Sequence, residues 1–262
     1  MKQKFGVVIL IAVSLFQSCR IVPITNRPQL QLHSEKKIRR ISEVAYYEKV
    51  DLTYKGTPPL SKEDLVRVGK NMSSAINEYF ENHYGKKRIS GYSWEFNLSN
   101  NQEINAFCYP GGKIIFNTGI LPVCQDETGL ATVMGHEIAH AIARHANERK
   151  SRGTLTTIVL FPVLIISVLA TGSTLLFNLT KFGADLTNLG HSRKHEKEAD
   201  KMGLTFMALA GYNPEKAIDF WERMAKESKG SAPALLSTHP SDNKRITKLK
   251  KYLPEALKYY KP

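Results

Sequence analysis

The chain has 262 residues, a length that allows one well-buried core, and it contains no internal repeat that would indicate a solenoid or a tetratricopeptide tail. Its net charge is +13, but the basic residues are scattered and no nucleic-acid recognition motif accompanies them, so nucleic acid is not an expected partner. The positive charge favours anionic lipid headgroups or acidic substrates instead.

The N-terminus has the pattern of an export signal. Lys2 and Lys4 precede an apolar run from Val7 to Phe16, and a small residue leads into Cys19. This is the order of a secretory signal, and Cys19 stands where a bacterial lipoprotein carries its lipidated cysteine. We therefore predict a lipoprotein-type signal over 1–19 that holds the chain on membrane lipid through Cys19. Simple cleavage and an uncleaved anchor remain alternatives.

A polar, proline-containing tether is expected over 20–40, followed by one domain over 41–262. In this domain apolar residues recur at helical spacing after Ser61, and apolar and polar residues alternate over 94–98 as in a strand. These patterns predict an α+β fold that is mainly helical.

The two cysteines of the domain flank a predicted strand. Gly111-Gly112 indicates a turn into a strand over 113–117. Cys108 and Cys124 lie on either side of it, and export would allow a disulfide between them. Two free, partly buried thiols are the other alternative.

The stretch His136-Glu137-Ile138-Ala139-His140 is the strongest chemical signal in the chain. On a helix the two imidazoles lie one turn apart on one face and can bind the same zinc ion. Catalytic zinc sites have three protein ligands and a water molecule. Glu137 is expected to take the proton of that water and to pass it to the leaving amine. The motif therefore predicts peptide hydrolysis with one Zn²⁺ per chain.

A third ligand is expected from the acidic run that follows His195. Glu196 and Asp200 share one face of a helix at i, i+4 spacing. Glu196 would complete a His-His-Glu site. Asp200 would accept the outer N–H of a ligating histidine and so fix its tautomer.

The stretch from Gly153 to Thr180 carries no charge and is long enough to span a bilayer. The zinc ligands His140 and Glu196 flank it and must meet at one metal, whereas a full span would separate its ends by about 30 Å. We therefore predict a helical hairpin or bent helix, broken near Pro162 or Gly172, that covers the cleft or contacts the lipid surface. A buried core segment is the alternative.

Several motifs together resemble those of the zinc metallopeptidases that include HtpX, the CAAX prenyl endopeptidase, the mitochondrial Oma proteases and the periplasmic LoiP and BepA proteins, and they are most similar to the Oma and LoiP branch. The resemblance extends from about Gly91 to Arg245 and implies a zincin-like domain with a small sheet beside the HExxH helix. Its motifs are Asn105–Gly119, His136–His140 with Arg144-His145, Ser192-Arg193 before Glu196–Asp200, and Thr238-His239-Pro240 with Arg245.

The resemblance also implies roles for single residues. In this family the first glutamate of the ExEAD pattern is the third zinc ligand, which implies Glu196. The strand that contains Ile114 and Ile115 lies beside the active-site cleft in the family, where it would pair with an extended substrate. Asn105 precedes this strand and would donate a hydrogen bond to substrate or oxyanion, with a turn-forming role as the alternative.

Two further positions follow from the same motifs. His239 falls at the family's His-Pro position, where it would stabilise the oxyanion or approach the metal in a resting state. A hydrogen-bonded structural histidine is the alternative. Arg245 is expected to anchor a carboxylate of the site, Asp200 being the candidate.

These observations predict a membrane-tethered zinc metalloendopeptidase that cleaves unfolded or misassembled envelope proteins in quality control. The expected location is the periplasmic side of a bacterial cell envelope, with a lipid anchor. The alternative is a zinc-bound chaperone that captures substrates with little proteolysis. An intact Glu137 argues against this alternative, because a pure binding protein does not need a general base.

Overall fold

The computed structural model describes residues 18–50, 56–57, 60–227, 233–239 and 244–261. Most of the predicted signal therefore lies outside the described residues. The chain divides into two compact units: the first comprises the described residues up to Ile38 together with Arg144–Ser192, and the second comprises the others. The predicted boundaries at residues 19 and 40 stay predictions.

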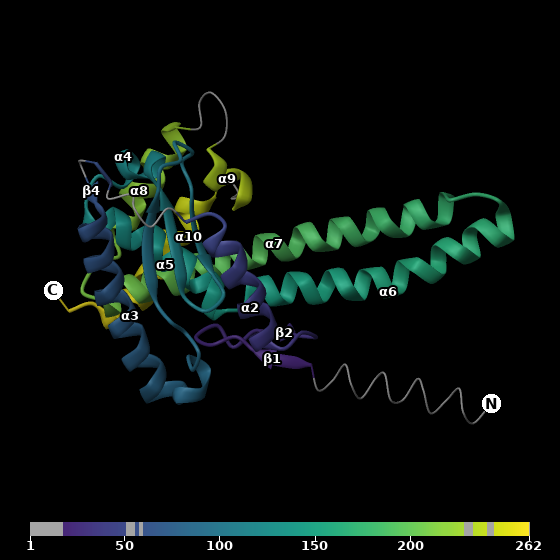
Figure 1. The fold of residues 1–262 in the computed structure, drawn as a ribbon, viewed down its shortest axis with the longest axis horizontal. Coiled ribbons are helices and arrows are strands. Elements are labelled where there is room, and N and C mark those ends of the chain that lie inside the picture. The colour runs from purple at the N-terminus through teal and green to yellow at the C-terminus, as the bar shows by residue number, and fades with distance from the viewer. Residues whose placement is uncertain (1–17, 51–55, 58–59, 228–232, 240–243, 262) are drawn as a thin grey trace. The chain divides into compact units, whose positions relative to one another are not determined.

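The second unit is built on a three-stranded sheet with the strand order β5-β7-β6 (Figure 1). β7 is central, parallel to β5 and antiparallel to β6. Helix α5 packs against α3, α8 and β6. The elements that lie in this unit, or cross into it, are α2 (Glu35–Tyr47), β3 (Gly56–Thr57), β4 (Leu60–Ser61), α3 (Lys62–Tyr84), β5 (Glu95–Ser99), β6 (Ala106–Tyr109), β7 (Lys113–Asn117), α4 (Leu121–Cys124), α5 (Glu127–Ile142), α7 (Leu175–Leu209), α8 (Lys216–Glu227), α9 (Ala234–Thr238) and α10 (Arg245–Ala256).

The helix predicted after Ser61 is confirmed as α3. Ser61 caps it: its hydroxyl accepts a hydrogen bond from the backbone N–H of Asp64 at 3.2 Å, and the Asp64 carboxylate accepts one from the Ser61 N–H at 2.8 Å. This reciprocal pair satisfies two N–H groups that the helix itself leaves without partners. Gly69 allows α3 to lie close to the sheet, because a Cβ there would stand 2.3 Å from the Phe96 ring.

Helix α5 is buried on all sides, as expected for a helix at the centre of a domain. It starts at a capping Asp126, whose side chain accepts a hydrogen bond from the Gly129 N–H at 2.8 Å, and every residue from Gly129 to Ile142 is buried. α7 crosses it closely, since a Cβ on Gly135 would lie 2.8 Å from the carbonyl oxygen of Gly203. This close crossing brings two distant segments of the sequence together.

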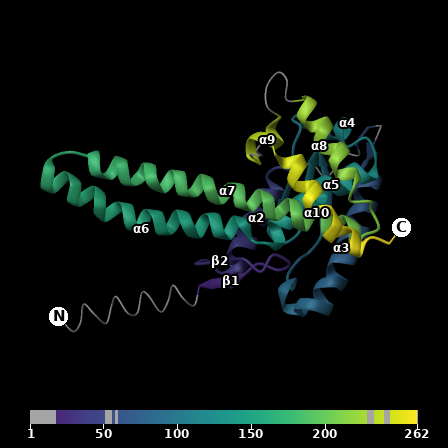
Figure 2. The ribbon, with the colours of Figure 1, turned by 180° about the vertical axis from the view of Figure 1, so that it is seen from behind.

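The first unit contains the strand pair β1 (Cys19–Ile21) and β2 (Pro28–Leu30) and a helical hairpin (Figure 2). We define the hairpin as α6 (His145–Thr171) and residues 175–192 of α7. α6 continues through Pro162 and ends at Gly172, whose φ of 64° is left-handed. The predicted hairpin is confirmed, with the break at Gly172, since glycine reverses a chain in this conformation without a steric penalty.

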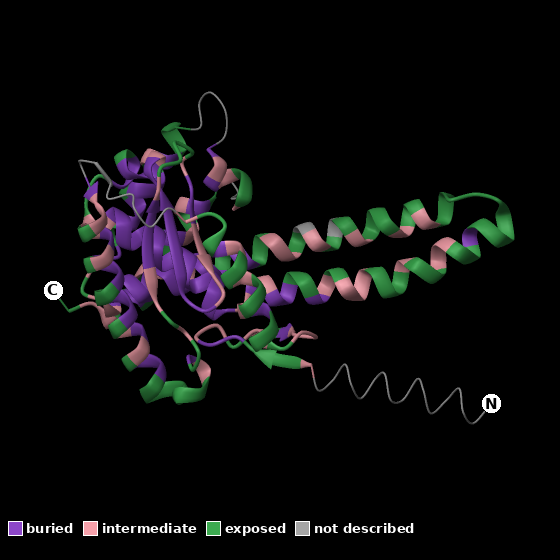
Figure 3. Ribbon diagram, in the orientation of Figure 1, coloured by how far each residue is buried: buried purple, intermediate pink, exposed green. Residues whose placement is uncertain are grey.

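The alternative of a buried core segment is wrong for this stretch. Figure 3 shows exposed positions along most of α6 and of the returning arm. Leu169 is 81% exposed, and only 6% of the most apolar window of α6 is buried. Among the described residues, α6 is also the one helix long and apolar enough to cross a membrane.

Residues 20–40 differ from the expected tether, because they contain most of the β1–β2 pair and the first turns of α2. Arg27 joins this segment to α6 through two hydrogen bonds to the Glu148 carboxylate, at 3.0 and 2.7 Å. Glu148 is fully buried. The segment is thus held by a buried ion pair.

Arg27→Ala is expected to lower the free energy of unfolding by about 3 kcal/mol, because it leaves the buried Glu148 carboxylate without its main cation. Urea unfolding followed by circular dichroism measures this loss. The control is Arg67→Ala, which breaks an ion pair with Glu127 whose side chains are 51% and 36% exposed; solvent screens such a pair, so its loss should lower the stability much less. Equal losses in the two variants would contradict the expectation.

Candidate metal centre

Two helices of the second unit bring three predicted ligands together. α5 carries His136 and His140, and the C-terminal part of α7 carries Glu196. All three side chains are at least nine-tenths buried. His136 Nε2 is 3.1 Å from His140 Nε2 and 3.3 Å from Glu196 Oε2, and His140 Nε2 is 3.4 Å from Glu196 Oε1.

These distances fit one tetrahedral metal ion. Ligand atoms about 2.0–2.1 Å from a tetrahedral zinc ion lie about 3.3–3.4 Å from one another. The donor set of two imidazoles and a carboxylate is one that zinc accepts in hydrolytic sites. The three ligand atoms, together with one from His239, all lie within 4.8 Å of one another. The residues therefore fit a zinc ion.

The outer nitrogen of His136 is held by Asp200. His136 Nδ1 lies 3.0 Å from Asp200 Oδ1, and Arg245 donates a hydrogen bond to the same oxygen. This arrangement fixes the ring so that Nε2 faces the other ligands. The Arg245 guanidinium in turn lies 3.3 Å from the centre of the Trp221 ring. Asp200 and Arg245 thus lie together, as the spacing and the resemblance led us to expect.

The motifs in the sequence did not identify Trp221 as a residue of the site. Its ring centre is 5.7 Å from that of His136, so it packs against the ligand as well as against Arg245. An aromatic face attracts a guanidinium and restricts its position. The one signal in the sequence is the helical spacing of Ala217, Trp221 and Met224, which does not distinguish this role from ordinary packing.

The electrostatics of the site hold two of the three ligands in their metal-binding forms. Burial lowers the pKa of His140 to about 3. For His136 burial also acts to lower the pKa, but hydrogen bonds to Asp200 and Glu196 outweigh it and raise the pKa to about 9. Burial acts to raise the pKa of Glu196, yet the adjacent histidines lower it well below its usual range. His140 is therefore neutral and Glu196 ionised, and binding of a metal would release the proton held by His136.

Glu137 lies beside the ligands without being one. It is 3% exposed, and its Oε1 accepts no hydrogen bond from the described residues, although His239 Nε2 lies 3.4 Å away. Burying a carboxylate oxygen without a hydrogen bond costs folding free energy, so such an atom is expected mainly where it has a function. The atom is therefore placed to accept a proton from a molecule bound at the site.

His239 also reaches the centre. It follows the short helix α9, and the Leu235 N–H donates to the Ile104 carbonyl at 2.9 Å, which fixes that helix beside the start of β6. His239 Nδ1 is 3.2 Å from Glu196 Oε2 and 3.4 Å from His136 Nε2. Its Nε2 is 3.4 Å from Glu137 Oε1. His239 thus stands at ligand-to-ligand distance from two of the three ligands.

The predicted substrate strand needs a correction. β7 is hydrogen-bonded on both sides, and Ile114 and Ile115 are 0% and 2% exposed, so neither can pair with a peptide. The order of segments along the chain does not reveal which strand lies at the centre of a sheet. For this reason the prediction placed the substrate beside β7, which has no free edge. Among the described strands, β6 pairs only with β7, so the other edge of β6 is not paired with a strand.

β6 also passes close to α5, the helix that carries Glu137. Burial, and then the charge of Glu137, raise the pKa of the Cys108 thiol well above its usual range. Asn105 precedes β6, is buried, and uses its side-chain oxygen to accept a hydrogen bond from the Ala106 N–H at 3.0 Å. This contact reaches only the backbone of the next residue, and both the turn-forming role and substrate binding by Asn105 stay predictions. The alternative of free thiols is confirmed for Cys108 and Cys124.

Comparison with known proteins defines the family. The model of peptidase family M48 matches residues 70–253. The chain belongs to peptidase family M48. The resemblance inferred from the motifs is therefore confirmed, and so is the enzyme class: this M48 chain is a zinc-dependent metalloendopeptidase.

Relatives of this M48 chain come from several organisms. The Schizosaccharomyces pombe protein "Mitochondrial metalloendopeptidase OMA1" is 35% identical over 246 residues, which cover 93% of the chain and 69% of that protein. The human "Metalloendopeptidase OMA1, mitochondrial" is 30% identical over 259 residues, covering 95% and 49%. The Yersinia pestis "Beta-barrel assembly-enhancing protease" is 28% identical over 161 residues, covering 59% and 33%. The chain thus spans half or less of the last two proteins.

The relatives correct the predicted location. The OMA1 proteins of two yeasts, a plant and human are named mitochondrial, and this overturns the predicted bacterial periplasmic location. A short basic and apolar N-terminus is shared by several targeting signals, and therefore it does not define one compartment. The lipid anchor at Cys19 rested on the same signal and stays a prediction.

Proposed function

We propose that this M48 peptidase is a membrane-associated zincin-like enzyme that binds one Zn²⁺ and cleaves unfolded or misassembled proteins in quality control. The observation that carries this proposal is the combination of a His-His-Glu set at tetrahedral distances with a buried Glu137 oxygen that accepts no hydrogen bond from the described residues. The first feature suits a metal ion. The second suits proton transfer, which a structural metal site does not need.

Each residue has a distinct part in hydrolysis. When bound, zinc supplies a Lewis acid and lowers the pKa of a coordinated water. Glu137 receives the proton of the attacking water at Oε1, holds it in a buried setting, and returns it to the leaving amine. Asp200 keeps His136 in the orientation that directs Nε2 at the metal. Arg245 holds Asp200 ionised through charge and hydrogen bonding, which lower the pKa of this carboxyl against the effect of burial.

His239 is proposed to approach the metal in the resting enzyme. Its Nδ1 lies at ligand-to-ligand distance from Glu196 and His136, where a substrate oxygen would otherwise bind. Once the ring moves aside, the same imidazole is placed to donate a hydrogen bond to the oxyanion.

Substrate binding is proposed along the edge of β6. This edge adjoins α5, and backbone hydrogen bonds to it would hold an extended peptide with little selection of side chains. Such recognition suits unfolded or misassembled proteins, which expose extended segments of many sequences.

The full chain is expected to contain about one zinc ion and to cleave β-casein, an unfolded protein. Chelation should abolish cleavage, and added zinc should restore it. Zinc without cleavage of this or of other unfolded substrates would favour the substrate-capturing chaperone. A chain without affinity for zinc would contradict the proposed site.

A further inference from the structure

The hairpin exposes large apolar side chains along the outer faces of both of its helices near the tip. At about 100° per residue, those on α6 cover roughly half of the helix circumference, where a surface helix of a water-soluble protein presents polar residues to water. A lipid environment surrounds a helix on all sides. The exposed residues are Ile158, Val159, Phe161, Ile165, Ile166, Val168 and Leu169 on α6, and Leu175, Leu176, Leu179 and Phe182 on the returning arm.

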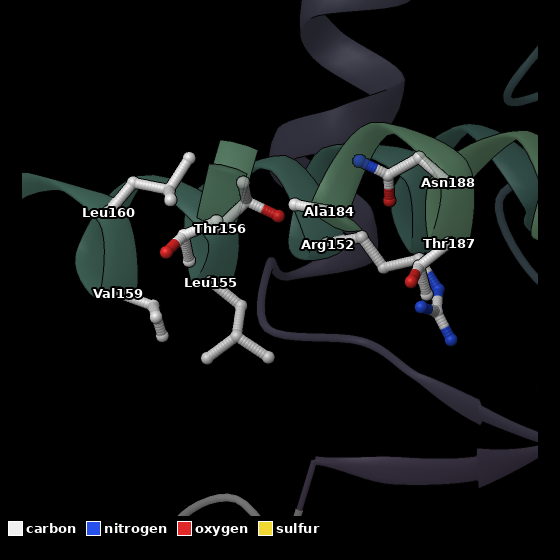
Figure 4. Close-up of a pocket in the computed structure, with 9 residues that line it drawn as sticks. Arg152, Leu155, Thr156, Val159, Leu160, Ala184, Thr187 and Asn188 are labelled. Carbon is white, nitrogen blue, oxygen red and sulfur yellow. The ribbon is translucent and has the colours of Figure 1, made fainter. Parts of the chain in front are cut away.

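The inner face of the hairpin mixes small or polar side chains with the apolar Leu155, Val159 and Leu160. Figure 4 shows Thr156 on α6 and Ala184, Thr187 and Asn188 on α7 gathered where the two helices border a cavity. Small and hydroxyl-bearing residues at a helix contact, with large apolar residues outside, are typical of helices packed within lipid. A water-soluble helix pair has the reverse distribution.

Five hydroxyl groups of the hairpin donate hydrogen bonds within the hairpin itself. The Thr157 and Thr180 hydroxyls donate to backbone carbonyls four residues earlier, at 3.0 and 2.8 Å. Thr171 and Thr187 do the same at 2.7 and 2.9 Å, and Ser167 donates to the Ser173 carbonyl across the turn at 2.6 Å. Hydrocarbon requires such internal partners, because it offers no hydrogen bonds of its own.

Charge on the returning arm limits how far the hairpin can enter a bilayer. Lys181 and Asp185 form an exposed ion pair at 2.7 Å, and residues 175–181 span only about 10 Å of helix. A lysine can extend its amine a few ångströms toward the headgroups. The tip can therefore enter to about 15 Å, the depth of one leaflet, but cannot cross a core of about 30 Å.

We propose that the hairpin inserts residues 161–179 into one leaflet of a lipid bilayer and holds the enzyme on the membrane in a monotopic manner. This deepens the membrane association proposed above by naming the segment and its depth. It does not require proteolysis.

The test uses tryptophan fluorescence in the full chain with Glu137→Gln, mixed with equimolar phosphatidylcholine and phosphatidylglycerol vesicles. Leu169→Trp reports on the tip, where the native side chain is 81% exposed. The matched control is Val44→Trp on α2, where the native side chain is 58% exposed. When the phosphatidylcholine is brominated along its acyl chains, the tip tryptophan is expected to shift to the blue and lose most of its added fluorescence, and the control to lose none.

A second variant secures the interpretation. Adding Ile165→Asp and Ile166→Asp to Leu169→Trp should abolish the quenching, since two carboxylates would have to enter hydrocarbon. An unquenched tip tryptophan, or equal quenching of the control, overturns the proposal. A blue shift without quenching also overturns it, because another protein surface would then cover the tip. Casein cleavage by the Glu137 form without quenching refutes this inference alone, whereas quenching without cleavage leaves it standing and refutes the proposed function.

Discussion

Glu137→Gln is expected to reduce kcat/KM for an unfolded substrate by about 10²–10⁴-fold, because the amide cannot accept the proton of the attacking water. Zinc content should not change, since Glu137 lies outside the His-His-Glu set. β-Casein cleavage and metal analysis of the same preparation measure both quantities.

The control for this variant is Glu127→Gln, which makes the same chemical change in the first turn of the same helix. Glu127 pairs with Arg67 at the surface, so its loss should leave activity within a factor of about two. Full activity of Glu137→Gln would contradict the assignment of the general base.

Glu196→Gln should weaken zinc binding by more than about 100-fold, since a charged ligand is replaced by a neutral amide. Asp200→Asn should weaken it by about 10–100-fold, because only the orientation of His136 is affected. Competition with a chromophoric chelator measures both affinities. Unchanged affinity in Glu196→Gln, or a greater loss in Asp200→Asn, would refute the ligand assignment.

The ligands were predictable from the sequence because their chemistry is local. Two histidines at i, i+4 share a helix face wherever that helix lies, and Glu196 was found by residue type in a second helix. The hairpin was predictable for a different reason: residues on either side of it had to meet at one metal. That constraint alone excludes a full span, because the two ends of a span cannot lie at the same metal ion.

The sequence does not show which strands lie side by side in a sheet, or which side chains from different elements are in contact. The choice between β7 and β6 as a substrate strand depends on pairing between segments, which no local pattern encodes. The contact of Trp221 with Arg245 depends on the packing of α8 against α10 in the same way. The compartment depends on a targeting signal, and the catalytic motifs carry no information about the compartment.

The brevity of β6 has a consequence for which proteins this enzyme would degrade. Its four residues extend over about 13 Å, so a substrate must offer a continuous extended segment of similar length. A folded domain with an unfolding free energy of about 5–10 kcal/mol exposes such a segment for only about one part in 10⁴ to 10⁷ of the time. Cleavage rates should therefore follow the opening equilibrium of the substrate. Recognition through such a strand would select substrates by their conformational stability and not by their sequence. A destabilised protein would be degraded in proportion to the fraction of time it is unfolded.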